Sequence, residues 1–495
     1  MLGKAAPCYN PAMSGTKPFV LVNCNVVRPP VSPVGLEYLG EALRDAGVAV
    51  EVVDLALIPD GLSALGKALS HLQPLAVGLS VRNTDDCSFA SGHSFLPWIA
   101  EVVAETRRHT DAPVVLGGVG FSVTPQGVVG ATGADMGIAG DGEMAAALLA
   151  ERLHRGEEPW DTPGLVYRRG GRVVANTRCP TPLKLLPPPR RSLFDNHRYQ
   201  EEGAIVGVET KRGCPKGCIY CADPVSRGRR LRLRPPGIVA AEFAYLVSSG
   251  VTWFHLCDAE FNSSLGHAKA VCRALIRAGL GERIRWYTYC SPLPWDDELL
   301  ALMRRAGCAG INFGVDSFHN PQLRRLGREH RREDVAELVD GLRRTGLSFM
   351  FDLLVGAPGE DEASVRETVE EAQRLGLPLA GLAVGVRVYS DTPLSRLLAR
   401  GGKRGLRPAH HGGLHEPVFY ISPALGKDAL GLVQHLVRDD PRFLLLASPQ
   451  DADGYNYAGD DRLQEAIRRG ARGAYWDILR PSPSGEGLRR EMGTG

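Results

Sequence analysis

The chain has 495 residues, of which 44% are hydrophobic, and its 58 basic and 56 acidic side chains leave a net charge of +2. This length and composition exclude a collagen-like or disordered chain and predict two or three globular domains. The nearly neutral charge provides no overall field to hold nucleic acid or an anionic membrane. The apolar runs are too short or too interrupted to cross a bilayer, and no secretion signal opens the chain. We therefore expect a cytoplasmic protein with no nucleic-acid and no membrane partner.

Residues 1–18 are expected to form a flexible tail and residues 19–156 a first domain. Within this domain, short buried apolar segments alternate with amphipathic segments at the spacing of βα units. The expected strands are Phe19–Asn23, Val48–Val53, Leu75–Ser80, Val114–Leu116 and Met136–Ile138, and the expected helices are Val34–Ala46, Leu62–Leu72, Phe95–Arg107 and Met144–Leu153. This alternation predicts an α/β fold with a doubly wound, Rossmann-like parallel sheet. Such sheets bind their ligands at the carboxyl ends of the strands.

Residues 157–200 are rich in Pro, Gly and Arg, and we expect them to form a linker. Residues 201–399 carry a second βα series. Its expected strands are Ala204–Thr210, Trp253–Cys257, Ile284–Tyr289, Gly310–Gly314, Phe349–Val355 and Leu382–Val388. Six such units predict an open or partial (β/α)6 barrel with its chemistry at the carboxyl ends of the strands. The alternation of strands and helices is lost after this domain, so residues 400–495 are expected to form a small C-terminal cap.

The strongest chemical signal is a Cys triad directly after the first strand of the second series. Cys214, Cys218 and Cys221 stand at C-x3-C-x2-C spacing, with Tyr220 between the last two. The eleven Cys of the chain are odd in number and scattered, which argues against a disulfide framework. Three thiolates on one short loop can bind three corners of a 4Fe-4S cube and leave one iron open. The alternatives are a zinc knuckle with a distant fourth ligand, or Cys packed as small apolar side chains.

This triad, placed after the first strand of a partial barrel, resembles the signature of the radical SAM superfamily over residues 204–396. The resemblance implies that the open iron binds S-adenosylmethionine (SAM) and that one electron then yields a 5′-deoxyadenosyl radical. It also implies cofactor contacts from Asp258 in an Asp-x-x-Phe segment and from Asp316 and Ser317 in the motif of the fourth strand. Gly356, in a Gly-x-Pro-Gly-Glu turn, would approach the adenine. Tyr220 is expected to shield one side of the cofactor.

The first domain is similar to the cobalamin-binding domain of class B radical SAM enzymes. Two Gly-rich turns carry this resemblance, Gly117 and Gly118 after the fourth strand and Gly140, Gly142 and Glu143 after the fifth. The resemblance implies that the nucleotide tail of cobalamin lies against them. No Asp-x-His-x-x-Gly follows the first strand, so no His is offered as the lower ligand of cobalt. A vestigial domain that binds nothing fits the same sequence, and this alternative stays open.

A polar cluster that contains Arg82 and Asn83 follows the third expected strand, at the edge where the lower face of a corrin would lie. An Arg side chain is always protonated and cannot ligate cobalt, but it could hold water away from the metal. The alternative is an edge Arg paired with Asp85 or Asp86.

Three tyrosines, Tyr287, Tyr289 and Tyr389, stand near strand ends expected to face the barrel mouth. A phenol there could donate hydrogen to a substrate radical, whereas packing in the core is the more frequent role of a Tyr in a strand. The basic run Arg227–Arg234 could meet an anionic group of the substrate or an acidic electron donor such as flavodoxin or ferredoxin. Solvated charge without a partner explains this run equally well.

The two resemblances together imply a cobalamin-dependent radical SAM methyltransferase that uses a 4Fe-4S cluster, SAM and cobalamin. We expect it to methylate an unactivated centre of a small molecule. The abundance of Arg, Ala, Gly and Pro suggests a high-GC genome, and by association with such genomes we expect the tailoring of specialised metabolites, such as antibiotic biosynthesis. The alternative enzyme is a radical SAM dehydratase, cyclase or rearrangement enzyme whose cobalamin domain is vestigial or serves redox only. An electron-transfer or metal-sensing protein is a third reading, disfavoured because three Cys leave a cluster labile.

Overall fold

The computed structural model describes residues 17–186, 189–402, 404–408, 417–438, 440–445 and 461–480. The expected N-terminal tail lies almost wholly outside these residues. The chain forms two compact units. The first unit contains residues up to Thr84, Ser94–Asn196 and Val225–Gly228, and the second contains Asp85–His93, His197–Pro224 and the chain from Arg229 onward. Within the described ranges, no helix is long and apolar enough to span a membrane.

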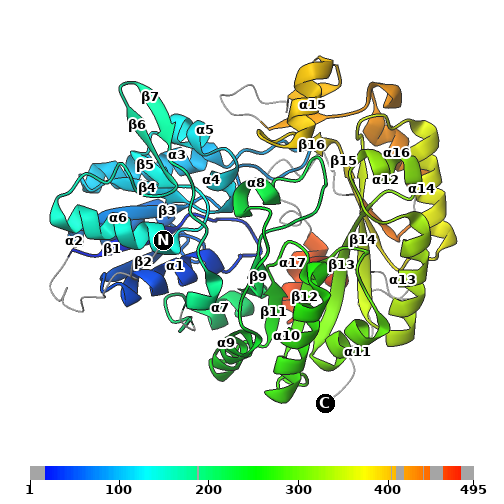
Figure 1. Ribbon diagram of the computed structural model, residues 1–495, viewed down its shortest axis with the longest axis horizontal. Coiled ribbons are helices and arrows are strands. Elements are labelled where there is room, and N and C mark those ends of the chain that lie inside the picture. Colours follow the sequence, from blue (N-terminus) through cyan, green and yellow to red (C-terminus); the bar gives the residue numbers. More distant parts are fainter. Residues whose placement is uncertain are drawn as a thin grey trace, which may run out of the picture. The chain divides into compact units, whose positions relative to one another are not determined.

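The first unit is built on one sheet of seven strands in the order β2-β1-β3-β4-β5-β6-β7 (Figure 1). Its strands are β1 (Phe19–Asn23), β2 (Val50–Asp54), β3 (Ala76–Ser80), β4 (Val114–Gly117), β5 (Met136–Ile138), β6 (Leu165–Arg169) and β7 (Arg172–Ala175). Its helices are α1 (Val34–Asp45), α2 (Gly61–His71), α3 (Leu96–His109), α4 (Val119–Val123), α5 (Pro125–Thr132) and α6 (Glu143–Arg155). The first five strands are parallel, which confirms the doubly wound sheet.

Alternation along β1 explains why both faces of this sheet are covered. Phe19 and Leu21 pack with α1 and α6 on one face, whereas Val20 and Val22 pack with α2, α3 and α5 on the other. A strand buried on both faces is apolar at every position, as the sequence of β1 is. The order β2-β1-β3 places the reversal of strand order between β1 and β3, where doubly wound sheets bind their ligands.

The segment expected to be a linker is part of the first unit. Strand β6 pairs antiparallel with β5 and β7 pairs antiparallel with β6, so the sheet continues beyond the five strands that were expected. Farther along, Asn196 donates to Glu37 of α1 over 2.6 Å, and Leu193 and Phe194 join the apolar core. The Pro- and Gly-rich composition concealed this because the two strands form an edge hairpin, and a hairpin needs only a turn with Gly170 and Gly171 at positive φ.

The second unit is a partial barrel of parallel strands in the order β19-β15-β14-β13-β12-β11-β8 (Figure 1). Its strands are β8 (Val206–Val208), β11 (Trp253–Leu256), β12 (Arg285–Cys290), β13 (Cys308–Asp316), β14 (Ser348–Val355), β15 (Ala380–Val384) and β19 (Phe443–Leu445). The outer helices are α9 (Pro236–Ser248), α10 (Leu265–Arg277), α11 (Asp297–Arg305), α12 (Asn320–Arg325), α13 (Arg332–Thr345), α14 (Glu362–Arg374) and α16 (Ala429–Val437). All six expected strands are present, which confirms the (β/α)6 barrel.

Short elements complete the described chain. They are α7 (Asn196–Glu201), β9 (Lys211–Arg212), α8 (Asp223–Arg227), β10 (Arg232–Leu233), β16 (Val386–Arg387), α15 (Pro393–Gly401), β17 (Leu406–Pro408), β18 (Val418–Tyr420), α17 (Asp461–Arg468) and α18 (Tyr475–Ile478). The C-terminal region is therefore not a separate cap. It supplies β19, which pairs with β15 as the seventh strand of the barrel sheet.

Helix α18 closes the amino-terminal end of the barrel, which we call the floor. Trp476 packs there with Tyr287 and Met350, whose side chains point into the barrel. Gly310 of β13 leaves room for it, since a Cβ at that position would lie 2.8 Å from the Trp476 ring. The hydroxyl of Tyr287 donates to Asp477 over 2.8 Å. The last described helix is therefore part of the interior of the barrel.

The segment Asp85–His93 leaves the first unit after Thr84 and belongs to the second. The Arg387 guanidinium donates from Nη2 to Asp85 over 2.8 Å and from Nε over 3.1 Å, and Asp85 is 2% exposed. Phe89 packs edge-on against Phe419 of β18 with ring centroids 5.7 Å apart. Asp85 thus forms a buried ion pair with Arg387.

Replacing Trp476 by Ala should remove the apolar filling of the floor. Truncation of a buried aromatic costs about 3–5 kcal/mol, because the cavity that is left collapses only in part. We expect a lower midpoint for the thermal transition of the barrel, measured by scanning calorimetry. The matched control is Trp160→Ala in the first unit, where the side chain is 37% exposed and a smaller loss is expected. Equal losses in both variants would contradict a packed floor.

Candidate active site

The three Cys of the triad lie on the loop between β9 and α8. Cys214 is buried, and Cys218 and Cys221 are half-buried. Within the described residues, no three Cys, His, Asp or Glu side chains converge as the ligands of a single ion would. A 4Fe-4S cube takes each thiolate at a different iron, so its ligands stand apart from one another.

The loop that carries the triad, which we call the cluster loop, is held by the turn after α12. The backbone N–H of Ile219 donates to Leu326 over 3.0 Å, and the N–H of Leu394 donates to Ile219 over 2.8 Å. Gly327 has a φ of +74°, and a Cβ there would lie 2.3 Å from the carbonyl oxygen of Gly217. Only Gly allows the two turns to approach this closely.

Burial raises the pKa of all three triad thiols above that of a free Cys, to about 11 for Cys218. Backbone N–H groups of Lys216 and Asp223 point at Cys214 and Cys221 and partly oppose this shift. Without a cationic partner these thiols stay protonated at neutral pH. Bound iron would supply the positive charge that makes them thiolates.

Asp258 fixes the entry to the cluster loop. Its carboxylate accepts bonds from the Thr210 backbone over 2.8 Å and hydroxyl over 2.5 Å, and from the Lys211 backbone over 3.2 Å and ammonium over 2.7 Å. Both charged side chains are almost fully buried. Burial would raise the pKa of Asp258, but the Lys211 ammonium outweighs it and holds that pKa below its usual range. The carboxylate predicted to contact cofactor thus orders the strand that leads to the triad.

Tyr220 and Asp316 are joined by Arg328, a residue that the sequence analysis missed. Tyr220 donates to Asp316 over 2.7 Å, and Arg328 donates to Asp316 over 2.5 Å and to the Tyr220 hydroxyl over 2.9 Å. Asp316 has a φ of +67°, which is rare for a residue other than Gly. No local motif marks Arg328, because it lies on the loop after α12 and reaches back to the strand end.

Glu260, two residues after Asp258, is the second carboxyl beside the triad. Burial raises its pKa to about 7, and Arg328 opposes this shift from 4.0 Å. One of its oxygens has no hydrogen-bond partner among the described residues. The signal for Glu260 was present in the same short segment, but the motif directed attention to Asp258.

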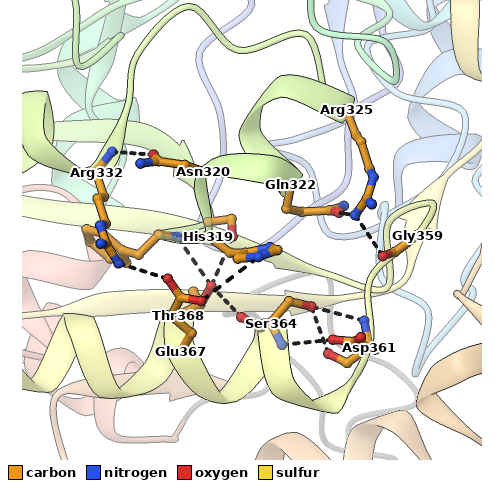
Figure 2. Close-up of polar contacts among 12 residues, drawn as sticks. His319, Asn320, Gln322, Arg325, Arg332, Gly359, Asp361, Ser364, Glu367 and Thr368 are labelled. Carbon is orange, nitrogen blue, oxygen red and sulfur yellow. Dashed lines mark hydrogen bonds and ion pairs between the residues drawn. The ribbon is translucent and has the colours of Figure 1, made fainter.

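Ser317 is fully buried, and its hydroxyl lies 2.9 Å from that of Thr368 on α14. Figure 2 shows Thr368 and Ser364 on α14 facing the start of α12, where Thr368 also accepts from the Phe318 backbone over 3.2 Å. The backbone N–H of His319 donates to Ser317 over 3.1 Å. The Ser317 hydroxyl thus connects the carboxyl end of β13 to helix α14.

The turn that begins at Gly356 is closed by its own Glu. Glu360 accepts from the backbone N–H groups of Gly356 over 2.5 Å and Ala357 over 3.0 Å. Ser422 donates its backbone N–H to Gly356 over 2.8 Å. The Glu of the Gly-x-Pro-Gly-Glu motif therefore holds the turn at the carboxyl end of β14, which leaves Gly356 at the edge where adenine was expected.

The three tyrosines are placed differently from one another. Tyr287 lies at the floor and not at the mouth, so its expected position is wrong. It occupies an early position of β12, where alternation points it inward beneath the site. Tyr289, two residues later, is 43% exposed and faces His255 edge-on at 5.6 Å. The hydroxyl of Tyr389 lies 2.9 Å from the thiol of Cys87, beside the Arg387 guanidinium at 4.5 Å from its ring.

In the first unit, the loops after β3 and β4 touch at the carboxyl edge of the sheet. Gly118 has a φ of +107°, and a Cβ there would lie 2.6 Å from the Val81 carbonyl oxygen. Gly120 donates to Arg82 over 2.9 Å, and the Arg82 side chain is exposed. A Cβ at Gly117 would meet nothing within 4 Å. Gly117 therefore borders open space, as the resemblance to a cobalamin-binding turn requires.

The turn after β5 is packed against protein. A Cβ at Gly140 would lie 3.4 Å from Arg178, and one at Gly142 would lie 3.2 Å from Leu39. Glu143 is buried, and Thr181 donates to it over 3.4 Å. Asn83 also lies at the carboxyl edge, half-buried after β3.

Comparisons with known proteins agree with both units. The model of the B12 binding domain matches residues 20–150, and that of the radical SAM superfamily matches residues 208–372. Tryptophan 2-C-methyltransferase of Streptomyces laurentii is 30% identical over 442 residues, which cover 77% of this chain and 74% of that protein. The chain belongs to the cobalamin-dependent radical SAM methyltransferases.

The similarity to solved structures extends over nearly the whole length of the chain. TsrM from Kitasatospora setae, with cobalamin and a [4Fe-4S] cluster bound, is 27% identical with a TM-score of 0.85, covering 94% of this chain and 97% of that one. A second TsrM structure, with tryptophan and a SAM analogue, is 28% identical at the same score and coverage. The radical SAM enzyme OxsB, 17% identical with a TM-score of 0.70, shares the fold and covers 82% of this chain and 64% of that one.

The residues present fit the three cofactors of this methyltransferase family: a 4Fe-4S cluster, SAM and cobalamin. Cys214, Cys218 and Cys221 would hold the cluster, because the buried loop offers three thiols and leaves a fourth corner for SAM. Gly117 offers the open backbone surface that a cobalamin tail needs.

Replacing Asp258 by Asn should leave the buried Lys211 ammonium without its anion. Removal of one partner of a buried ion pair costs about 3–5 kcal/mol. We expect a lower melting temperature and less iron retained after anaerobic reconstitution, measured by iron and sulfide analysis. The control is Asp296→Asn. The Asp296 side chain is 40% exposed in its ion pair with Lys269, so less stability depends on that pair. Asn is also a favourable N-cap residue, so the cap of α11 is kept. Full iron content in Asp258→Asn would refute the anchoring role.

Replacing Gly117 by Leu should block cobalamin without disturbing the fold, because the new side chain enters open space. We expect the corrin absorption to be lost after reconstitution, while melting temperature and iron content stay unchanged. Gly130→Leu on α5 is the control, since a Cβ there also meets nothing within 4 Å and the site lies away from the carboxyl edge. Normal cobalamin content in Gly117→Leu would place the tail elsewhere.

Proposed function

We propose that this methyltransferase acts on a carbon atom of an aromatic amino acid, with tryptophan or a close indole relative as its substrate. The observation that carries the proposal is the agreement with TsrM over nearly the full length of both chains, since one of those TsrM structures holds tryptophan. The relative from Streptomyces laurentii is named for methyl transfer to tryptophan. An uncharacterized methyltransferase of Pyrococcus horikoshii, 24% identical over 380 residues, covers 74% of this chain and 79% of that protein.

The cofactors supply the methyl group and the one-electron chemistry, and the residues of the chain supply position and shielding. The Asp258–Lys211 pair orders the cluster loop, and Arg328 orients Asp316 and Tyr220 beside it. Trp476 closes the floor, so water and ligand reach the interior from the other end. Tyr289 is the tyrosine of the three that we propose to face the substrate.

We further propose an acidic electron-carrier protein as partner. The exposed Arg229 donates to the backbone carbonyls of Pro215 over 3.2 Å and Lys216 over 3.0 Å, within the cluster loop itself. The neighbouring Arg230 is exposed as well. Positive charge at the surface of the cluster loop favours the approach of a protein of opposite charge.

Turnover with SAM that carries a CD3 group tests the proposed function. With tryptophan as substrate, we expect a product in which CD3 replaces one hydrogen, detected by mass spectrometry, together with near-equal amounts of S-adenosylhomocysteine and 5′-deoxyadenosine. A variant with Cys214, Cys218 and Cys221 all replaced by Ala should form none of these products. A product of unchanged carbon count, with 5′-deoxyadenosine alone, would instead support a dehydratase or cyclase.

A further inference from the structure

A polar layer lies inside the barrel between the floor and the cluster loop. It is formed by Asn312 of β13, Asp352 of β14, Tyr289 of β12 and His255 of β11, and we call it the lumen layer. Alternation places these side chains inward, because the residues on either side of Asn312 and Asp352 belong to the outer apolar core. Asn312 is aligned with Tyr289 in the parallel register of β12 and β13. Asp352 is aligned with Gly314 and His255 with Tyr287, so the four inward groups are staggered along the barrel.

The lumen layer rests on the floor. A Cβ at Gly381 of β15 would lie 3.1 Å from an Asp352 carboxylate oxygen and 3.4 Å from the Met350 side chain, so Asp352 stands directly above Met350. Toward the cluster loop, the next inward position of β13 is Gly314, where a Cβ would lie 2.9 Å from the Arg328 guanidinium. Asn312 is paired in register with Met350 and Asp352 with Gly314, so the lumen layer extends from the floor to the level of the Arg328 guanidinium.

Hydrogen bonding in this layer is incomplete. The Asn312 side chain is 5% exposed, and its amide N–H group opposes the rise that burial gives the pKa of Asp352. A carboxylate can only accept hydrogen bonds, so the amide N–H group of Asn312 faces Asp352 and the amide oxygen points away from it. This oxygen has no partner among the described residues. A buried acceptor without a donor costs free energy, so such a group is normally kept for a ligand or water that satisfies it.

The charge around the layer is also unbalanced. The groups that act electrostatically on Asp352 are the carboxyls of Asp316 and Glu260 and the single guanidinium of Arg328, which Asp316 already engages. Two further carboxyls and one guanidinium thus act on Asp352, and Lys216 acts on Glu260 as well. A ligand that brings N–H donors and positive charge would satisfy the Asn312 oxygen and the Asp352 carboxylate together.

We infer that Asn312 and Asp352 form a subsite for the protonated amino group of the substrate, the α-ammonium of an aromatic amino acid. The ring of such a substrate would contact Tyr289 and His255, which stand edge to face beside Asn312. This inference rests on the proposed function for the identity of the ligand. The methionyl ammonium of SAM has the same chemistry, so the experiment must separate the two sources.

Equilibrium dialysis of the reconstituted holoenzyme tests the subsite with three probes. These are L-tryptophan, tryptamine, which lacks the carboxylate, and indole-3-propionate, which lacks the amine. The wild-type protein should bind the two amines about 10- to 100-fold more tightly than indole-3-propionate, the range expected for a hydrogen-bonded charge. This comparison needs no variant and holds even if a substitution impairs folding.

The Asp352→Asn variant should lose this preference. Its affinity for both amines should fall to that for indole-3-propionate, whereas its affinity for SAM should stay unchanged. Asp477→Asn is the matched control, because it makes the same change at the floor, and it should keep the preference. Weakened SAM binding with unchanged tryptophan binding would assign the layer to SAM and overturn the inference.

Two further results would overturn it as well: equal binding of tryptophan and indole-3-propionate by the wild-type protein, or no binding of any probe. The subsite and the proposed function fail separately. Amine binding through Asp352 without methyl transfer would refute tryptophan as the methyl acceptor and leave the subsite in place. Methyl transfer to tryptophan with an unaltered preference in Asp352→Asn would refute the subsite alone.

Discussion

The buried ion pair of Asp258 and Lys211 is the interaction on which the second unit depends. Neither charge is solvated, so each requires the other, and the geometry of both backbones is set by that requirement. Thr210 and Lys211 end the first barrel strand and begin the cluster loop, so the position of the three thiols follows from where Asp258 stands at the end of β11. The second strand of the barrel therefore positions the loop that follows the first. Arg328, on the loop after α12, acts in a similar way, because its hydrogen bonds hold Asp316 and Tyr220 in position.

Between the cluster loop and the floor, the barrel departs from the rule that buried polar groups are satisfied. The outer sides of the strands pack in an apolar core, whereas Asn312 on the inner side and Glu260 on the loop after β11 each have one oxygen without a partner among the described residues. Filling these positions with apolar side chains would stabilise an empty barrel. The chain keeps these polar residues, because functional sites commonly lower the stability of the fold that carries them.

Strands and helices were predictable because each is a local pattern. Phe19–Asn23 and Met136–Ile138 have the predicted bounds, and the triad was recognisable from its spacing alone. The strand β19 was missed because it has only three residues and its pairing partner β15 lies far away in the sequence. The hairpin of β6 and β7 was missed because its strands are short and half-polar and lie in a Pro- and Gly-rich segment. The same limit applies to Arg328 and Asp352. Their importance lies in which groups surround them, and no spacing in the sequence records that.

The position of α18 in the floor determines when the barrel can be completed during synthesis. The ribosome delivers the chain from its amino end, and domains generally begin to fold as they emerge. Trp476 and Asp477 come after all seven strands of the barrel sheet. Until they arrive, Tyr287 and Met350 face an uncovered opening. A chain that ends early would expose an apolar surface inside an otherwise assembled barrel, and cellular quality control could recognise it there.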